Sequence, residues 1–358
     1  MSGAPLEWLV VEHPAERPVL AVDLGGTQIR AALITPDRSV HCRRAEPTRD
    51  EDGVETVVDR IVEVVAEVRA AAAADGLPPA VGIGISSPGP LDQRRGVVLS
   101  PPNLRGWHDV PIAQRLAAGL GMPAFLERDT NVAITAEWRY GAARGTSDAV
   151  YLTVSTGIGG AVISNGRLLT GPTGLAGEAG HVVVELDGPR CGCGGIGHAE
   201  AIGSGTGIER AARELLDRGA APVLAGLVED GEALDAALVA RAADAGDADA
   251  RAVLERAWVA VGALCASLVN LLEPEVIVIG GGIAEHRPRL FEVARHERDR
   301  RVMPAFAGRT RIEPAALGGD VSLIGLLPIV NDRIGDPSWA AGSKASRMAT
   351  AEQGAVPS

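Results

Sequence analysis

Two cysteines and two histidines lie close together in one glycine-rich segment, HVVVELDGPRCGCGGIGHAE, which runs from residue 181 to 200. Thiolate and imidazole groups are the usual ligands of structural Zn²⁺, which takes four ligands in a tetrahedron. The candidate zinc ligands follow the spacing H-x9-C-x-C-x4-H and are His181, Cys191, Cys193 and His198. Two alternatives stay open for these residues: a redox disulfide, whose usual spacing is C-x-x-C, and a pair of buried thiols without a metal.

Three glycine-rich turns, each directly after an apolar run, indicate a phosphate-bearing ligand. Glycine lets backbone N–H groups approach an anion because no Cβ stands in the way. None of the three has the P-loop pattern GxxxxGK[ST], and each one alone also fits an ordinary hairpin turn. Asp23, near the end of the first apolar run, could orient a water bound to Mg²⁺. The candidate nucleotide-binding residues are Asp23, Gly25, Gly26, Thr27, Thr156, Gly157, Gly159, Gly280, Gly281 and Gly282.

Apolar runs and helical spacing predict the elements that carry these turns. The predicted strands lie within residues 19–35, on both sides of Gly25-Gly26, and at 80–86, 149–155 and 275–282. The predicted helices lie at 54–74, at 129–140 and within 203–272. A strand–turn–strand pattern occurs twice, as VLAVDLGGTQIRAAL and as VYLTVSTGIGGAVI, which suggests two related halves. Buried strands that alternate with helices are typical of the α/β class.

The composition of the 358-residue chain narrows the classes of function. With 46% hydrophobic and 22% charged residues it fits a soluble globular protein. A net charge of −12 argues against nucleic acid as the main partner, because phosphate binding requires a basic surface. No apolar run is expected to reach the length of a membrane span, and no signal peptide pattern is present, so a cytoplasmic location is expected. Four cysteines are too few for a disulfide framework.

Six motifs occur in the order found in the ROK family (repressors, open reading frames and kinases), which the chain therefore resembles. They are DLGGT, SSPGPLD, PNLRGW, GIGG, GEAGH with CGCGGIGHAE, and LLEPEVIVIGGGI. The resemblance runs from about Val19 to about Asn331 and is nearest to the zinc-containing bacterial glucokinases. It implies the actin/hexokinase-like (ribonuclease H-like) ATPase fold, with two α/β domains and a cleft. The expected parts are an extension at 1–18, a smaller domain at 19–132 joined by a helix at about 320–335, a larger domain at 133–319 with the zinc loop, and a disordered tail at 336–358.

The resemblance also implies roles for single residues. Asp129, in LERDTNVA, corresponds to the catalytic base, although an aspartate at a helix start is also a common cap. Relatives hold a structural zinc with one histidine and three cysteines, and His198 stands at the third cysteine position. The residue before the base is usually Asn but is Arg128 here, and many relatives have Lys where this chain has Gln28. The implied sugar-binding residues are Asn103, Glu178, His181 and Glu200.

These features together predict an ATP-dependent sugar kinase that uses Mg²⁺, with a structural Zn²⁺, in carbohydrate metabolism and glycolysis. Glucose phosphorylated on its 6-hydroxyl is the first expectation. The alternatives are another hexose, an N-acyl hexosamine, polyphosphate as the donor, or a sugar-responsive ROK regulator without catalysis. Only 18 residues precede the first strand, which argues against the DNA-binding segment of such a regulator. Family resemblance implies a homodimer or homotetramer.

Overall fold

The computed structural model describes residues 15–285 and 287–339, and these fall into two compact units. The first unit ends at Asp129 and resumes at Ser322, and the second runs from Thr130 to Val321. The predicted extension lies largely outside the described residues, as does the predicted disordered tail from residue 340 onward. Residues 336–339 are described, and there Trp339 packs its ring on the guanidinium of Arg333.

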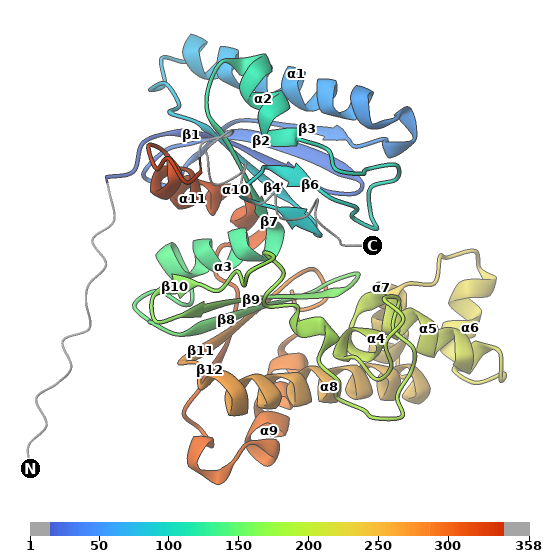
Figure 1. The fold of residues 1–358 in the computed structure, drawn as a ribbon. Helices are drawn as coiled ribbons and strands as arrows, with labels where there is room; N and C mark the ends of the chain where they lie inside the picture. The colour runs from blue at the N-terminus through green and yellow to red at the C-terminus, as the bar shows by residue number, and fades with distance from the viewer. Residues whose placement is uncertain (1–14, 286, 340–358) are drawn as a thin grey trace, which may run out of the picture. The chain divides into compact units, whose positions relative to one another are not determined.

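The first unit contains a five-stranded mixed sheet in the order β3-β2-β1-β4-β7 (Figure 1). The strands are β1 (Val19–Leu24), β2 (Gln28–Ile34), β3 (Val40–Pro47), β4 (Ile83–Ser87) and β7 (Ala124–Arg128). β1 pairs antiparallel with β2 and parallel with β4, and β4 pairs parallel with β7. The short strands β5 (Leu91–Asp92) and β6 (Val97–Val98) form a separate hairpin. The carboxyl ends of β1, β4 and β7 therefore lie at one edge of the sheet.

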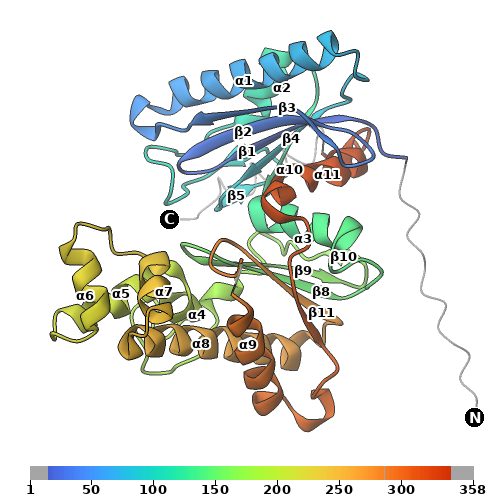
Figure 2. The ribbon, with the colours of Figure 1, turned by 180° about the vertical axis from the view of Figure 1, so that it is seen from behind.

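Helices cover both faces of this sheet. α1 (Val54–Ala74) and α2 (Ile112–Leu120) lie on one face, and α11 (Leu326–Arg333), which follows the short α10 (Val321–Ile324), lies on the other (Figures 1 and 2). α1 has the predicted bounds, and its apolar positions, such as Val57, Ile61 and Val65, are fully buried. The 3.6-residue repeat of these valines and isoleucines fixes which side of the helix faces the sheet.

The second unit has the same strand topology, formed by a different segment of the chain. Its sheet has the order β10-β9-β8-β11-β12, with the hairpin β8–β9 and parallel pairs β8–β11 and β11–β12. The strands are β8 (Ala149–Val154), β9 (Ile158–Ser164), β10 (Arg167–Leu168), β11 (Val276–Gly280) and β12 (Arg311–Pro314). In both units the first two strands form a hairpin and the fourth strand lies parallel beside the first. The two-half α/β organisation expected from the repeated glycine hairpin is therefore confirmed.

Alternate residues of β8 pack on different helices. Leu152 and Val154 join the core formed with α8 (Ala248–Leu272) and α9 (Pro288–Arg301), whereas Tyr151 packs on the side of α3 (Asp129–Tyr140). The remaining helices are α4 (Ala199–Gly203), α5 (Gly205–Leu216), α6 (Pro222–Glu229) and α7 (Ala236–Asp244), with short turns η1 to η4 at Asp50–Asp52, Ala179–His181, Pro304–Phe306 and Gly318–Asp320. The helix predicted at 129–140 is confirmed with the same bounds.

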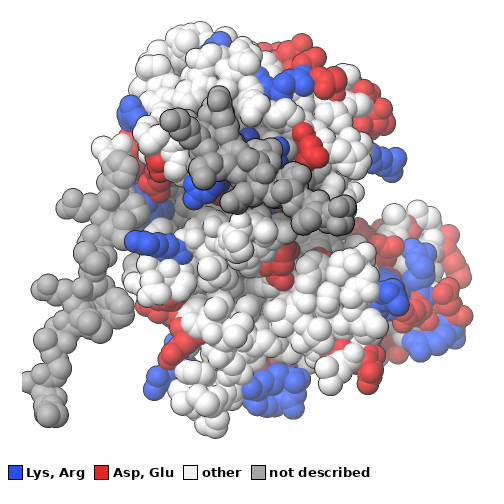
Figure 3. Space-filling model, viewed as in Figure 1, with Lys and Arg blue, Asp and Glu red and all other residues white. Residues whose placement is uncertain are grey.

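α8 corrects one expectation from the sequence. Its 25 residues have a window with mean hydropathy 1.6, so by length and composition the helix could cross a membrane. In the structure 67% of that window is buried, as expected of a core helix. On the face of the molecule that Figure 3 shows, acidic and basic side chains of the described residues are interspersed. Around α5 to α7 several of them form exposed ion pairs.

Candidate active site and metal centre

The first glycine turn is tightly closed and lies against Asn103. The Gly25 N–H donates to the Gln28 carbonyl at 2.9 Å, and the Thr48 hydroxyl donates to the Gly25 carbonyl at 2.7 Å. A Cβ added at Gly26 would lie 2.8 Å from the backbone oxygen of Asn103. Glycine is therefore required at position 26, and the structure brings a predicted sugar-binding residue next to the predicted phosphate loop.

Asp23 and Asp129 follow strands that end at the same sheet edge. Asp23 pairs in register with Ser86 of β4, and Ser87 pairs with Arg128 of β7, so Asp129 leaves the sheet one residue beyond that row. Ligands of open α/β sheets bind outside the carboxyl ends of parallel strands. Asp129 is partly exposed and is the first residue of α3. This position suits both a helix-start aspartate and a proton acceptor.

The strand that leads to Asp129 is fixed by a buried ion pair that the sequence does not reveal. Glu127 is fully buried and pairs with Arg333, which is 7% exposed and also donates to the Leu126 carbonyl at 3.0 Å. Glu127 Oε1 accepts from the Arg128 N–H at 2.8 Å and from the Gln93 amide at 3.3 Å. Arg128 itself is 3% exposed. No local pattern could identify this pair, because its members lie 206 residues apart.

The second and third glycine turns meet at one edge of the sheet in the second unit. Gly281 has φ +95°, and a Cβ there would lie 2.5 Å from the Val154 carbonyl and 2.8 Å from the Thr153 hydroxyl. The Ile283 N–H donates to the same Val154 carbonyl at 3.1 Å. Because β8 and β11 are parallel neighbours, the turn after β8 and the turn after β11 lie side by side. The candidates Thr156, Gly157, Gly159 and Gly280 to Gly282 are thereby brought together.

The segment with Glu178 and His181 packs directly on β9. A Cβ at Gly180 would lie 1.9 Å from the Ile158 carbonyl, so the backbones touch without a side chain between them. Glu200 accepts the Ile158 N–H on Oε2 at 2.9 Å, and a Cβ at Gly157 would lie 2.6 Å from this oxygen. The predicted sugar-binding residues of the second unit are therefore neighbours of its predicted phosphate turn.

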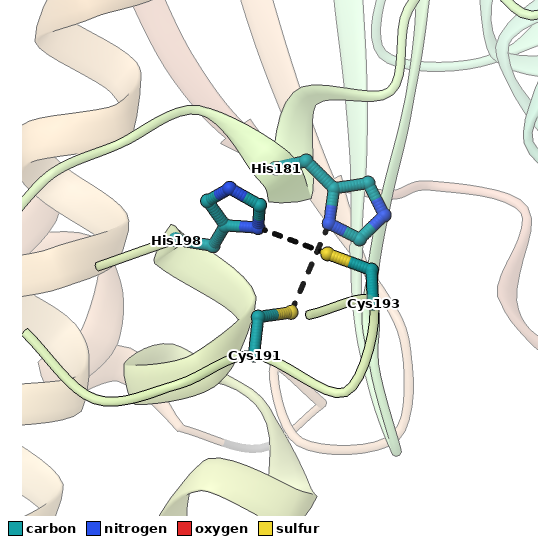
Figure 4. Close-up of side chains that lie close together, drawn as sticks. All are labelled: His181, Cys191, Cys193 and His198. Atoms are coloured by element: carbon teal, nitrogen blue, oxygen red, sulfur yellow. Dashed lines mark hydrogen bonds between the residues drawn. The ribbon is translucent and has the colours of Figure 1, made fainter. Parts of the chain in front are cut away.

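The four candidate metal ligands converge (Figure 4). Their ligand atoms all lie within 4.8 Å of one another. Cys193 Sγ is 3.3 Å from His198 Nδ1, and Cys191 Sγ is 3.9 Å from His181 Nδ1. Bonds of about 2.3 Å to sulfur and about 2.0 Å to nitrogen place tetrahedral ligand atoms about 3.3 to 3.8 Å apart. The donor set and its spacing fit a four-coordinate metal after small shifts of the side chains.

Turns with glycine hold this loop in shape. The Cys191 N–H donates to the Gly195 carbonyl at 2.8 Å, and the Gly194 N–H, at φ +96°, donates to the Cys191 carbonyl at 2.9 Å. A Cβ at Gly195 would lie 2.2 Å from His198 Cε1. The imidazole of His198 therefore occupies the space that glycine leaves at position 195.

The two cysteines of the loop are free thiols in different environments. Cys191 is buried and Cys193 is exposed. Burial raises the pKa of the Cys191 thiol to about 11, and the neighbouring Glu200 carboxylate, 3.4 Å from Sγ, acts in the same direction. A cation between the four ligands would supply the positive charge that a thiolate requires at this position.

Comparison with known proteins identifies the class to which this fold and these motifs belong. The ROK family model matches residues 19–333. The chain therefore belongs to the ROK family.

Individual relatives are similar over nearly their whole length. A glucokinase of Thermotoga maritima is 37% identical over 317 residues, which cover 88% of this chain and 98% of that protein. An N-acetylmannosamine kinase of Shigella flexneri is 35% identical over 278 residues, covering 77% of this chain and 87% of that protein. The crystal structure of a ROK family glucokinase from Streptomyces griseus in complex with glucose and AMPPNP is 29% identical with a TM-score of 0.73, covering 87% of this chain and 98% of that one.

Proposed function

We propose that the protein is an ATP-dependent sugar kinase that phosphorylates the 6-hydroxyl of glucose. The observation that carries the proposal is the position of Asp129, a partly exposed carboxylate one residue beyond β7, at the sheet edge that also carries the first glycine turn. The chain also has 37% identity to a glucokinase. Oxygen donors and glycine turns fit Mg²⁺ and ATP, whose metal neutralises charge on the phosphates when bound.

In the proposed reaction Asp129 accepts the proton of the attacking sugar hydroxyl. The oxygen of that hydroxyl forms a bond to the γ-phosphorus, the bond from this phosphorus to the bridging oxygen breaks, and ADP leaves with that electron pair. Asn103, Glu178, His181 and Glu200 orient the sugar through its hydroxyl groups. Carboxylates accept hydrogen bonds from neighbouring hydroxyls, and an amide both donates and accepts. Because phosphoryl transfer depends mainly on positioning, an ordinary carboxylate is a sufficient base.

The Asp129→Asn variant tests the base. It keeps the size of the side chain and its ability to begin α3, so the protein should stay folded. We expect its turnover to fall at least about a thousandfold, because general base catalysis and charge at the reacting atoms are both lost. An ADP-release assay with circular dichroism as the folding control measures this. Turnover near that of the wild type would refute the assignment.

The identity of the sugar is the second part of the proposal. Arg128 stands where relatives usually have Asn, and an N-acetylmannosamine kinase is 35% identical, so an N-acyl hexosamine is the alternative substrate. An assay over glucose, mannose, fructose and N-acetylmannosamine, each with ATP and with polyphosphate, separates these cases. A higher kcat/KM for another sugar would replace glucose. Absence of turnover on every sugar would favour a sugar-binding regulator.

We further propose that His181, Cys191, Cys193 and His198 bind one structural Zn²⁺. Support comes from the convergence of the four ligand atoms. These are two imidazole nitrogens and two thiol sulfurs, with no carboxylate among the four. With four protein ligands the metal has no open position, so its role is to hold the loop rather than to activate water. Elemental analysis of purified protein should give about one zinc per chain.

We also propose a cytoplasmic location and a homodimer or homotetramer as the working form. Light scattering tests the oligomeric state.

A further inference from the structure

Arg30 joins Asp23 to the start of the C-terminal helices within the first unit. Asp23 and Arg30 are register partners on β1 and β2. Arg30 donates to Asp23 Oδ2 from Nε at 3.1 Å and from Nη2 at 2.5 Å. The same Nη2 donates to the Ser322 hydroxyl at 2.8 Å. The Asp23 and Arg30 side chains are only 15% and 22% exposed, so water screens this pair weakly.

These contacts restrict the orientation of the Asp23 carboxylate. Two donors of one planar guanidinium bind the same oxygen, which limits rotation of the carboxylate. Among the described residues no hydrogen bond to Oδ1 is present, so that oxygen remains for a ligand. Mg²⁺ prefers oxygen ligands and keeps several of its waters, and a fixed carboxylate oxygen is well suited to accept from such a water.

Arginine is the residue type that this arrangement requires. Its rigid fork can bind Asp23 and Ser322 at the same time, whereas the single ammonium of lysine is a point charge on a flexible stem. The register of the hairpin places Arg30 directly opposite Asp23, because the turn at Gly25 to Thr27 fixes the pairing.

We propose that Arg30 is a positioning residue for the metal–nucleotide complex: it holds Asp23 so that Oδ1 accepts a hydrogen bond from a water bound to Mg²⁺. The inference rests on the proposed kinase function and assigns a role to a residue that does not itself touch the substrate. Groups that orient the inner residues of a metal site change metal affinity or activity about 10- to 100-fold when they are altered.

The test variant is Arg30→Lys, which keeps the positive charge and removes the fork. With ATP fixed, we expect the Mg²⁺ concentration for half-maximal rate to rise about tenfold, while the KM for the sugar changes less than about twofold. Calorimetry with AMPPNP gives a readout that is independent of turnover. The gain in AMPPNP affinity on adding Mg²⁺ should shrink in the variant, while the affinity measured in excess chelator stays that of the wild type.

Two further variants complete the test. Ser322→Ala removes one contact of Arg30 and should shift the Mg²⁺ dependence in the same direction by a smaller factor. It also carries the test if Arg30→Lys fails to fold. Arg44→Lys is the matched control, because Arg44 lies on β3 and makes exposed contacts, a 3.9 Å ion pair with Glu67 and a donation to the Arg43 carbonyl at 3.1 Å.

The outcomes separate the inference from the function on which it rests. A wild-type protein that shows no Mg²⁺-dependent phosphorylation of any sugar overturns the proposed function. If the wild type is active and both Arg30→Lys and Ser322→Ala show the same Mg²⁺ dependence as the wild type, the role of Arg30 is overturned. The proposed kinase function then still stands.

Discussion

Replacing Gly195 by alanine should weaken binding of the proposed metal while sparing the fold. The added Cβ would lie 2.2 Å from Cε1 and 2.5 Å from Nε2 of His198, far inside contact distance. Gly195 does not have a positive φ, so alanine fits its backbone. The clash involves only the ring of one side chain, which can turn away when no metal holds it. The apoprotein should therefore lose little stability, whereas the loaded protein loses a ligand.

The magnitude follows from linkage between metal binding and folding. Loss of one of four ligands should weaken metal affinity at least as much as loss of a group that only orients a ligand, about 100-fold, which at saturating metal removes about 2.7 kcal/mol of the stabilisation of the loaded protein. For a unit of roughly this size, each kcal/mol corresponds to about 2 to 4 °C in Tm. The melting temperature of the loaded variant should thus fall by about 5 to 10 °C. The apoproteins should melt within about 2 °C of each other.

Gly192→Ala is a matched control in the same loop. Gly192 also lacks a positive φ, and a Cβ there would meet nothing within 4 Å. Thermal melts in buffers of fixed free Zn²⁺, together with competition against a chromophoric chelator, compare the two variants. If Gly195→Ala binds zinc and melts like Gly192→Ala, then His198 is not a metal ligand and the fit of the four residues to a metal is wrong.

Two further predictions concern stability. Asp247→Ala should cost about 2 to 3 kcal/mol, because Asp247 accepts four backbone N–H groups and so caps both α6 and α8, whereas Asn should cost about half as much. Burial alone would raise the pKa of Asp247, but the four backbone donors outweigh burial and hold this pKa below its ordinary value. The difference in free energy of unfolding between wild type and Asp247→Ala, measured in urea, should therefore be full above about pH 4. It should shrink as the pH falls through the lowered pKa. Arg333→Met should cost about 3 to 5 kcal/mol, because it removes the Arg333 guanidinium from the fully buried Glu127 carboxylate. Adding Glu127→Gln should restore part of that loss in the same unfolding assay, and an additive double variant would contradict this coupling.

The sequence predicts those features whose cause is local. The valine periodicity of α1 and the residues of α3 suffice to place both helices with their bounds. The glycine turns are predictable because only glycine permits the close backbone approach that the structure shows at Gly26 and Gly281. The four candidate metal ligands lie within 18 residues, so their spacing alone suggests a site.

Other features depend on pairing between distant segments. β3 carries mostly exposed residues and no apolar alternation, so no pattern predicts it; it forms because β2 offers an edge. The contact of Arg30 with Asp23 requires the register of a hairpin, and its contact with Ser322 spans 292 residues. The Glu127–Arg333 pair likewise exists only once α11 packs on the sheet.

His181 shows how one side chain can belong to both proposed sites of the second unit. Its Nδ1 lies 3.9 Å from Cys191 Sγ, while its Nε2 lies 3.9 Å from a carboxylate oxygen of Glu178. A metal on Nδ1 fixes the proton on Nε2, which then can only donate. Glu200 makes a second link, since its two oxygens contact Cys191 Sγ and the Ile158 N–H. A metal bound at the proposed site would therefore act on the proposed sugar site indirectly: it would orient the His181 ring and the Glu200 carboxylate without contacting the sugar itself.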